Sequence, residues 1–250
     1  MKNLGYYNGK YDLIENMQIP MSDRSHWFGD GVYDATCAKN HKIMAIDEHI
    51  DRFFNSANAL KINLGFDKLY LKNLLNELVQ KLDDADLFVY WQVTRGGKGL
   101  RSHNYNLEDK ANLWITITPE KITDRNRIYK LTLVEDTRFL HCNIKTLNLI
   151  PSVMAYQLAR ENGYDEAVFH RKDIVTECAH SNIHILKNGE FITHPADEYI
   201  LAGIARSHLI KACKALNIKV KEREFTEYAV KPLALAIGDI RRVHRICVSN

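Results

Sequence analysis

Lys145 is the residue whose surroundings most clearly suggest covalent chemistry. It lies in the stretch 142–149, between a strand-like run and a helix start, with Ile144, Leu147 and Leu149 around it. A lysine among apolar side chains must be paired, neutralised or covalently occupied, because burying an isolated charge is unfavourable. One chemistry that uses such a lysine is attack on an aldehyde, which holds the amine as a Schiff base. Residue type alone favours an exposed lysine before a helix, so the interpretation depends on other residues.

Arg101 and His103 form a second candidate group, in a loop that follows the glycine-rich stretch 96–99. Residues i and i+2 of an extended segment point to the same side, so these two side chains can converge. The alternative is that both are simply exposed to solvent in a glycine-rich loop. The spacing alone does not decide between the two interpretations.

Composition and charge indicate an ordinary globular protein and exclude several classes. Of 250 residues, 46% are apolar and 26% are charged, and the net charge of +3 comes from Lys and Arg spread along the chain. We therefore expect no nucleic-acid or polyanion partner. The N-terminus lacks the basic-then-apolar order of a signal peptide, and no apolar run has the length of a membrane span. These features predict a soluble, cytoplasmic protein without membrane association.

Cysteine usage leads to the same expectation. The cysteines are widely spaced and odd in number, which favours reduced thiols in the cytosol: Cys37, Cys142, Cys178, Cys213 and Cys247. Cys178 and His180 are close enough to suggest a pair of metal ligands, but no second pair follows at the spacing of a zinc site. We therefore expect no metal.

Hydrophobic periodicity and turn residues predict helices and strands interleaved in both halves of the chain. The expected helices cover residues 48–60, 69–82, 151–163 and 205–216, and the expected strands cover 87–95, 113–118, 129–134, 165–170, 183–186 and 190–193. Asp47 is expected to cap the first of these helices, and Asn188-Gly189 predicts a hairpin. Because the order lacks a regular βαβ alternation, we expect an α+β fold in two lobes with a site between them.

A polar stretch that follows Pro119 is the expected boundary between the lobes. Residues 1–118 are expected to form a small N-terminal α+β domain, and residues 119–127 an interdomain linker. Residues 128–250 are expected to form a larger C-terminal α+β domain.

Seven stretches of the chain are specific when taken together, in their order and spacing. They cover residues 28–34, 48–52, 92–96, 142–148, 175–182, 193–195 and 200–206. This set resembles the fold-type IV pyridoxal-phosphate transaminases, and within that family the D-amino acid branch, over residues 3 to about 229. The resemblance implies the two-lobed α+β architecture of that family, with the active site between the lobes and at a dimer interface.

The resemblance implies three principal contacts to the cofactor, pyridoxal 5′-phosphate. Lys145 would hold it as a Schiff base and later move the α-proton of the substrate. Glu177 would face the pyridine nitrogen, where a carboxylate keeps that nitrogen protonated and the ring a better acceptor of electrons. Arg52 would bind the phosphate, although helical spacing alone makes it a solvated residue opposite Phe53 and Phe54.

Further cofactor contacts implied by the resemblance lie at the start of the last predicted helix. Ile204 and Ala205 would offer backbone N–H groups to the phosphate, as helix N-termini do. Gly203 would allow the close approach of that phosphate. Leu201 would support one face of the ring.

Tyr33, Arg101 and His103 resemble the group that binds the substrate α-carboxylate in the D-amino acid branch. In that family the loop reaches the site of the neighbouring subunit, which implies a homodimer. Branched-chain transaminases and aminodeoxychorismate lyases share the lysine and the glutamate but generally not the Arg-x-His pair. This pair therefore selects the branch.

The activity implied is amino-group transfer between D-amino acids and 2-oxo acids, with D-alanine as the expected donor and 2-oxoglutarate as the expected acceptor. Because the lysine and the substrate amine exchange on the cofactor, ping-pong kinetics are expected. The alternatives are an aminodeoxychorismate lyase or a branched-chain aminotransferase of the same fold. A further alternative is an inactive homologue that binds pyridoxal phosphate.

The last alternative arises from the tail, because the family pattern ends near Tyr228. Relatives continue with an apolar strand and a Ser/Thr cluster that binds the phosphate, whereas residues 230–250 follow another pattern. A genuine, a truncated and a mis-ordered tail are all compatible with this departure. We therefore assign no phosphate role to Ser249.

Overall fold

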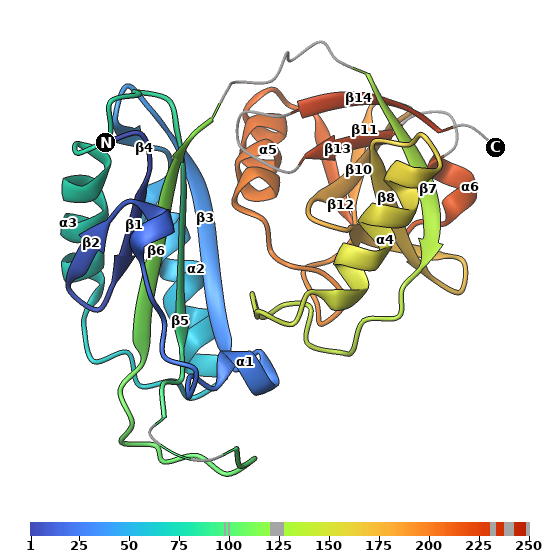
Figure 1. Ribbon diagram of the computed structural model, residues 1–250. Coiled ribbons are helices and arrows are strands. Elements are labelled where there is room, and N and C mark those ends of the chain that lie inside the picture. Colours follow the sequence, from blue (N-terminus) through green and yellow to red (C-terminus); the bar gives the residue numbers. More distant parts are fainter. Residues whose placement is uncertain (98, 100, 121–127, 231–233, 238–242, 249–250) are drawn as a thin grey trace. The chain divides into compact units, whose positions relative to one another are not determined.

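The computed structural model describes residues 1–250 except 98, 100, 121–127, 231–233, 238–242 and 249–250, with side chains as far as residue 230. The chain forms two compact units (Figure 1). One contains residues 1–122 and 144–148, and the other contains residues 123–143 and 149–250. Lys145 therefore belongs to the first unit, although it lies beyond the predicted linker. Residues 121–127 of that linker fall outside the described residues, so its boundaries stay a prediction.

The first unit is built on an antiparallel sheet in the order β2-β1-β6-β5-β3-β4. Its strands are β1 (Leu4–Tyr7), β2 (Lys10–Asp12), β3 (Gly31–Lys39), β4 (Lys42–Ile43), β5 (Leu87–Thr94) and β6 (Asn112–Pro119). The helices of this unit are a short 3-10 turn (Ile14–Asn16), α1 (Ser25–Phe28), α2 (Ile46–Ala59) and α3 (Lys68–Val79). β5 pairs along its whole length with β3 and β6, so it is central to the sheet.

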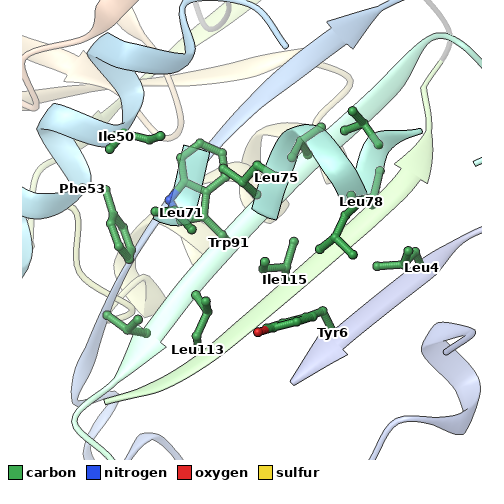
Figure 2. Packing of buried hydrophobic residues seen from close by; sticks show 14 of the residues in the cluster. Leu4, Tyr6, Ile50, Phe53, Leu71, Leu75, Leu78, Trp91, Leu113 and Ile115 are labelled. Atoms are coloured by element: carbon green, nitrogen blue, oxygen red, sulfur yellow. The ribbon is translucent and has the colours of Figure 1, made fainter. Parts of the chain in front are cut away.

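The core of the first unit forms where α2 and α3 meet the sheet (Figure 2). Phe53 of α2 and Leu71 and Leu75 of α3 are fully buried, as are Trp91 of β5 and Ile115 of β6. The rings of Phe53 and Trp91 meet edge to face with their centroids 6.2 Å apart. Burial of each large apolar side chain contributes about 1.5–3 kcal/mol, so this cluster fixes both helices on the sheet.

The second unit is built on a mixed sheet in the order β12-β11-β10-β13-β14-β7-β8-β9. Its strands are β7 (Tyr129–Glu135), β8 (Glu166–Arg171), β9 (Ile174–Cys178), β10 (Asn182–Lys187), β11 (Glu190–Thr193), β12 (Lys219–Glu222), β13 (Ala234–Ile237) and β14 (Val243–Val248). Its helices are α4 (Ile150–Glu161), α5 (Ile204–Ala215) and α6 (Glu227–Val230). The pairs β11–β12, β14–β7 and β7–β8 are parallel.

The tail takes part in this sheet. β13 and β14 lie beyond Tyr228, where the family pattern was expected to end, and they pair with each other and with β10 and β7. The C-terminal residues therefore supply strands to the middle of the sheet. Ser249 lies outside the described residues.

The helices and strands expected from periodicity are confirmed within a few residues, and Asn188-Gly189 joins β10 to β11 in a hairpin. The expected cap at Asp47 is wrong. α2 begins at Ile46, and the preceding residue, Ala45, has a left-handed backbone with φ 48° and no side-chain cap. Asp47 lies in the first turn, where its carboxylate accepts a hydrogen bond from Lys72 Nζ at 2.7 Å.

Within the described residues, no helix combines the length and the hydropathy needed to cross a membrane.

Replacing Phe53 by alanine tests the core of the first unit. Phe53→Ala should lower the free energy of unfolding by about 3–5 kcal/mol, because it removes a buried ring and leaves a cavity. Urea denaturation followed by circular dichroism measures the loss. Phe88→Ala is the matched control, since Phe88 lies on β5 but is 36% exposed, and it should cause a clearly smaller loss. Equal losses would contradict this description of the core.

Candidate functional site

The segment that carries Lys145 is fastened to β3 through the backbone. Tyr33 N donates to the Lys145 carbonyl at 3.0 Å, and Leu147 N donates to the Gly31 carbonyl at 3.1 Å. A Cβ added at Gly31 would lie 2.7 Å from Leu147 Cδ1 and would collide with a backbone carbonyl of β5. A side chain at position 31 is therefore excluded, and its absence lets the Lys145 segment pack directly on the strand.

The lysine amine lies over an aromatic ring. Lys145 is half-buried, and its Nζ is 4.1 Å from the centroid of the Tyr33 ring, which stacks on Tyr90 at 5.4 Å. Its backbone N–H donates to Ser56 Oγ of α2 at 3.2 Å. An ammonium over a tyrosine face is stabilised by the ring quadrupole. Backbone bonds and ring contact together fix the direction in which this amine points.

Asp34 of β3 is a completely buried carboxylate whose charge interacts with that of Lys145. Arg52 Nε and Nη2 donate to its two oxygens at 2.8 and 2.7 Å, and His49 Nδ1 lies 2.8 Å from Oδ1. Burial by itself would raise the pKa of Asp34. The charge and hydrogen bonds of Arg52, with the bond from His49, outweigh burial and hold that pKa well below its ordinary value. The charge of Lys145 acts in the same direction.

The alternative that helical spacing alone suggested for Arg52, a solvated side chain, does not hold. The Arg52 side chain is only 14% exposed, because the buried carboxylate of Asp34 needs a counter-charge from α2. The parallel pair of hydrogen bonds fixes the plane of the guanidinium. Its role toward a phosphate stays a prediction.

In the second unit, Glu177 of β9 lies in a chain of ion pairs. Arg138 Nη1 donates to Glu177 Oε1 at 2.5 Å, while Arg138 Nε and Nη2 form a fork on the two oxygens of Asp136 at 2.9 Å. Burial would raise the pKa of Asp136, but the hydrogen bonds and charge of Arg138 lower it. Burial likewise opposes the charge on Arg138, but its two carboxylate partners raise its pKa. The arginine is thus a fixed cation that orients Glu177.

The other carboxylate oxygen of Glu177 is hydrogen-bonded to Asn182 and to the backbone just before α5. Glu177 Oε2 accepts hydrogen bonds from Asn182 Nδ2 at 3.0 Å and from the Leu201 backbone N–H at 3.1 Å. Asn182 Nδ2 also donates to the Leu201 carbonyl at 2.9 Å. A Cβ added at Gly203 would collide with Asn182 Oδ1. One amide side chain therefore links the carboxylate to the turn that starts the helix.

The start of α5 offers backbone donors. The helix begins at Ile204 after the N-cap residue Gly203, and no described side chain caps its first turn. The N–H groups of Ile204 and Ala205 belong to this turn, where an α-helix has no internal acceptors. Such an end attracts anions.

Arg101 and His103 converge on one ring, although both side chains are exposed. The Arg101 guanidinium lies 5.0 Å from the centroid of the Phe28 ring, and the His103 ring lies 5.1 Å from it. Within the described residues, no contact joins Tyr33 to this pair. The structure thus brings two of the three expected substrate residues together and places Tyr33 with Lys145.

Sequence reasoning missed four residues of these clusters: Asp34, His49, Arg138 and Asn182. Three of them lie in stretches that carry the family resemblance, but no role was assigned to them. Arg138 lies outside those stretches, and its only signal is the Asp-x-Arg spacing directly after a strand. Among the described side chains, no group of three potential ligands could hold a metal ion.

Comparison with known proteins gives one consistent result. The family described as amino-transferase class IV matches residues 31–232. A D-alanine aminotransferase of Listeria monocytogenes is 37% identical over 242 residues, which are 94% of this chain and 80% of the relative. One of Bacillus licheniformis is 35% identical, over 88% of this chain and 78% of the relative.

Solved structures of similar fold include two branched-chain aminotransferases. That of Thermoproteus uzoniensis has a TM-score of 0.89 at 20% identity, covering 98% of this chain and 87% of its own. That of Escherichia coli has a TM-score of 0.88 at 18% identity, covering 100% of this chain and 88% of its own. At these identities the likeness concerns the fold alone.

Neutralising Asp34 tests the ion cluster on β3. Asp34→Asn should lower the free energy of unfolding at neutral pH by about 3–5 kcal/mol, because it removes the anion of a buried ion pair with Arg52. Since the folded-state pKa of Asp34 is lowered, its stabilisation is present above about pH 4 and is lost as the pH falls further. Urea titrations between pH 7 and pH 3 should therefore show a shallower loss of stability in the variant.

Asp51→Asn is the matched control, because Asp51 lies on the same helix as Arg52 and forms an exposed ion pair with Lys68 of α3. It should change stability by less than about 1 kcal/mol. An acid dependence that Asp34→Asn leaves unchanged would show that another group is responsible.

Proposed function

We propose, from the fact that this chain belongs to the class IV aminotransferases, that it transfers amino groups between D-amino acids and 2-oxo acids with pyridoxal 5′-phosphate as cofactor. That membership confirms the family read from the sequence, and the α+β fold with two units agrees with it. The observation that carries the D-amino acid assignment is the identity to proteins named D-alanine aminotransferase over 94% of the chain. D-Alanine is the proposed donor and 2-oxoglutarate the proposed acceptor.

The residues present fit this cofactor. Glu177 is a buried carboxylate oriented by Arg138, and a guanidinium beside a carboxylate favours its ionised form. This is the partner that a protonated ring nitrogen requires. The uncapped start of α5 suits a phosphate, and the bare Gly203 leaves room beside Asn182.

When bound, pyridoxal phosphate supplies an aldehyde that joins covalently to amines and a ring that accepts electrons when the α-proton leaves. We assign the aldehyde to Lys145, the ring nitrogen to Glu177 and the phosphate to the N–H groups of Ile204 and Ala205. Arg52 is proposed to supply charge to the phosphate, and Leu201 to support one face of the ring.

Lys145 is proposed to do two things in turn. Its Nζ would hold the cofactor, and the same amine, once free, would take the proton from the substrate α-carbon. Contact with Tyr33 and the backbone bonds to β3 keep the amine in one place throughout. Tyr33, Arg101 and His103 are proposed to bind the α-carboxylate. Because the second oxo acid reverses the sequence, ping-pong kinetics are expected.

A homodimer is part of the proposal. α4 presents an exposed apolar face formed by Ile150, Val153, Met154 and Leu158, of which Ile150 is 68% exposed. An apolar face of this kind is more typical of an interface between subunits than of a surface facing water. We further propose that the enzyme works in the cytoplasm. The four described cysteines, which are all free, support a reducing compartment.

The decisive experiment combines D-alanine with Lys145→Ala. Purified protein with pyridoxal phosphate should convert D-alanine and 2-oxoglutarate to pyruvate and D-glutamate, measured by chiral chromatography. Lys145→Ala should reduce the rate by at least about 10²–10⁴-fold, the range for removal of a group that transfers a proton. Lys68→Ala is the matched control, since Lys68 is a lysine of α3 with a side chain 54% exposed, and it should leave the rate unchanged.

Other outcomes would replace the assignment. Activity with L-valine or L-leucine but not with D-alanine would indicate a branched-chain aminotransferase. Release of pyruvate from aminodeoxychorismate without formation of D-glutamate would indicate a lyase. Failure to take up the cofactor, seen as no visible absorbance, would indicate an inactive homologue.

Gly203→Ala tests the proposed phosphate site. The added methyl would displace the Asn182 amide and with it the turn that starts α5, so the dissociation constant for pyridoxal phosphate should rise roughly tenfold or more. Titration of the cofactor-free protein, followed by tryptophan fluorescence, measures this constant. Gly99→Ala is the control, because an added Cβ there meets nothing within 4 Å. Unchanged affinity in Gly203→Ala would exclude this turn from the site.

A further inference from the structure

We propose that Arg24 is a positioning residue for substrate recognition. Its guanidinium holds the backbone of residues 102–104 and thereby presents Arg101 and His103 to the substrate carboxylate. This inference rests on the proposed function, because it takes Arg101 and His103 as carboxylate ligands. It adds a residue that touches neither substrate nor cofactor but sets the geometry of those that bind.

Three consecutive carbonyls of the loop point at one guanidinium. Arg24 Nη1 donates to the Ser102 carbonyl at 2.7 Å and to the Asn104 carbonyl at 3.1 Å, and Nη2 donates to the His103 carbonyl at 3.4 Å. The Arg24 side chain is only 10% exposed. Hydrogen bonds from a charged donor are stronger than neutral ones, particularly where water is excluded.

Apart from ring contacts, which include the Arg95 guanidinium 3.7 Å from the centroid of the Tyr105 ring, the loop has few other sources of order. Residues 101–105 belong to no helix or strand, and their side chains are exposed. Within the described part of the chain, no backbone–backbone hydrogen bond ties these five residues to the rest of the unit. The Arg24 guanidinium therefore replaces the backbone pairing that holds other segments in place.

Arg24 is itself held firmly. Its Nε donates to Asp30 Oδ2 at 2.8 Å, and Asp30 also accepts hydrogen bonds from Arg95 Nε. Arg95 in turn donates to the backbone carbonyls of Leu60 and Lys61 at 2.9 and 3.0 Å. The anchor of the loop is thus continuous with the end of α2 and with β5, which are rigid parts of the unit.

The ring of Phe28 connects this anchor to the two ligands. The Arg24 guanidinium lies 4.9 Å from its centroid, and both Arg101 and His103 pack on the same ring. If the loop moved, Arg101 and His103 would therefore both lose their contact with the Phe28 ring. Lys145 depends on β3, on Tyr33 and on the Asp34 cluster instead, so its chemistry should be little affected.

Kinetics of Arg24→Gln give the first test. The KM for D-alanine and the KM for 2-oxoglutarate should both rise roughly tenfold, because each substrate carries the same α-carboxylate. kcat should change by less than about twofold, the pattern expected when ground-state and transition-state binding are lost equally. Arg160→Gln is the control, since Arg160 forms an exposed pair with Asp165, and it should leave both constants unchanged.

A double-mutant cycle separates positioning from general stability. The variant Arg101→Ala/His103→Ala removes both ligands. If Arg24 acts through them, introducing Arg24→Gln into that variant should raise its KM little further. Full additivity would overturn the proposal, because it would show that Arg24 acts independently of the two ligands. If the pair variant itself binds D-alanine normally, the assignment of the carboxylate ligands fails. Absence of D-alanine activity in the unchanged protein would mean that the proposed function fails.

Limited proteolysis measures how well the loop is ordered and does not depend on enzymatic activity. Trypsin cleavage after Arg101, followed by mass spectrometry, should be several-fold faster in Arg24→Gln than in the unchanged holoenzyme. Arg24→Lys should fall between them, because lysine keeps the charge but lacks the planar fork of donors. Equal cleavage rates in all three proteins would show that Arg24 does not order the loop, and this readout serves even where a variant is less stable.

Discussion

The buried carboxylate of Asp34 is the constraint around which the first unit is organised. A carboxylate without a partner in this position would be unfavourable by several kcal/mol, so its neighbours must provide charge and donors. α2 provides both through Arg52 and His49, and this requirement fixes the rotation of the helix over the sheet. The charge of Lys145 adds to the same centre from a distant part of the sequence. Helix, strand and lysine are therefore coupled through one ionised group.

The second unit uses the same principle in a longer chain of contacts. Asp136 fixes Arg138, Arg138 fixes Glu177, and Glu177 fixes Asn182 and the turn before α5. Every link is a charged or amide group that finds its partner away from water, where an unpaired group would be costly. The carboxylate of Glu177 and the backbone donors at the start of α5 are thereby kept in register by a single network. Burial makes the network rigid, and complete pairing makes burial possible.

Sequence patterns predicted the helices and strands because their apolar faces repeat at regular spacing, as Phe53 and Leu71 show. They could not predict the environment of Arg52, because the partner that removes it from solvent lies eighteen residues away on another element. The Asp47 cap failed for a local reason, since Ala45 takes the left-handed turn that starts α2 one residue earlier. For Arg138 the only signal was the Asp-x-Arg spacing after a strand, which does not show that Glu177 is its second partner. The spacing of apolar residues predicts which face of a helix or strand is buried. Ion pairs depend on which elements pack against each other, and spacing does not show that.

Two acidic residues, Asp30 just before β3 and Asp34 within it, support different parts of the first unit. Asp30 is paired with Arg24 and Arg95 and supports the loop of Arg101 and His103, whereas Asp34 is paired with Arg52 and lies near Lys145. Asp30 directly precedes the strand that carries Asp34, and the two carboxylates pair with different arginines. A change in the loop anchor can therefore move Arg101 and His103 without moving the lysine. This separation gives a physical reason why the loop of Arg101 and His103 can vary while the surroundings of Lys145 stay the same.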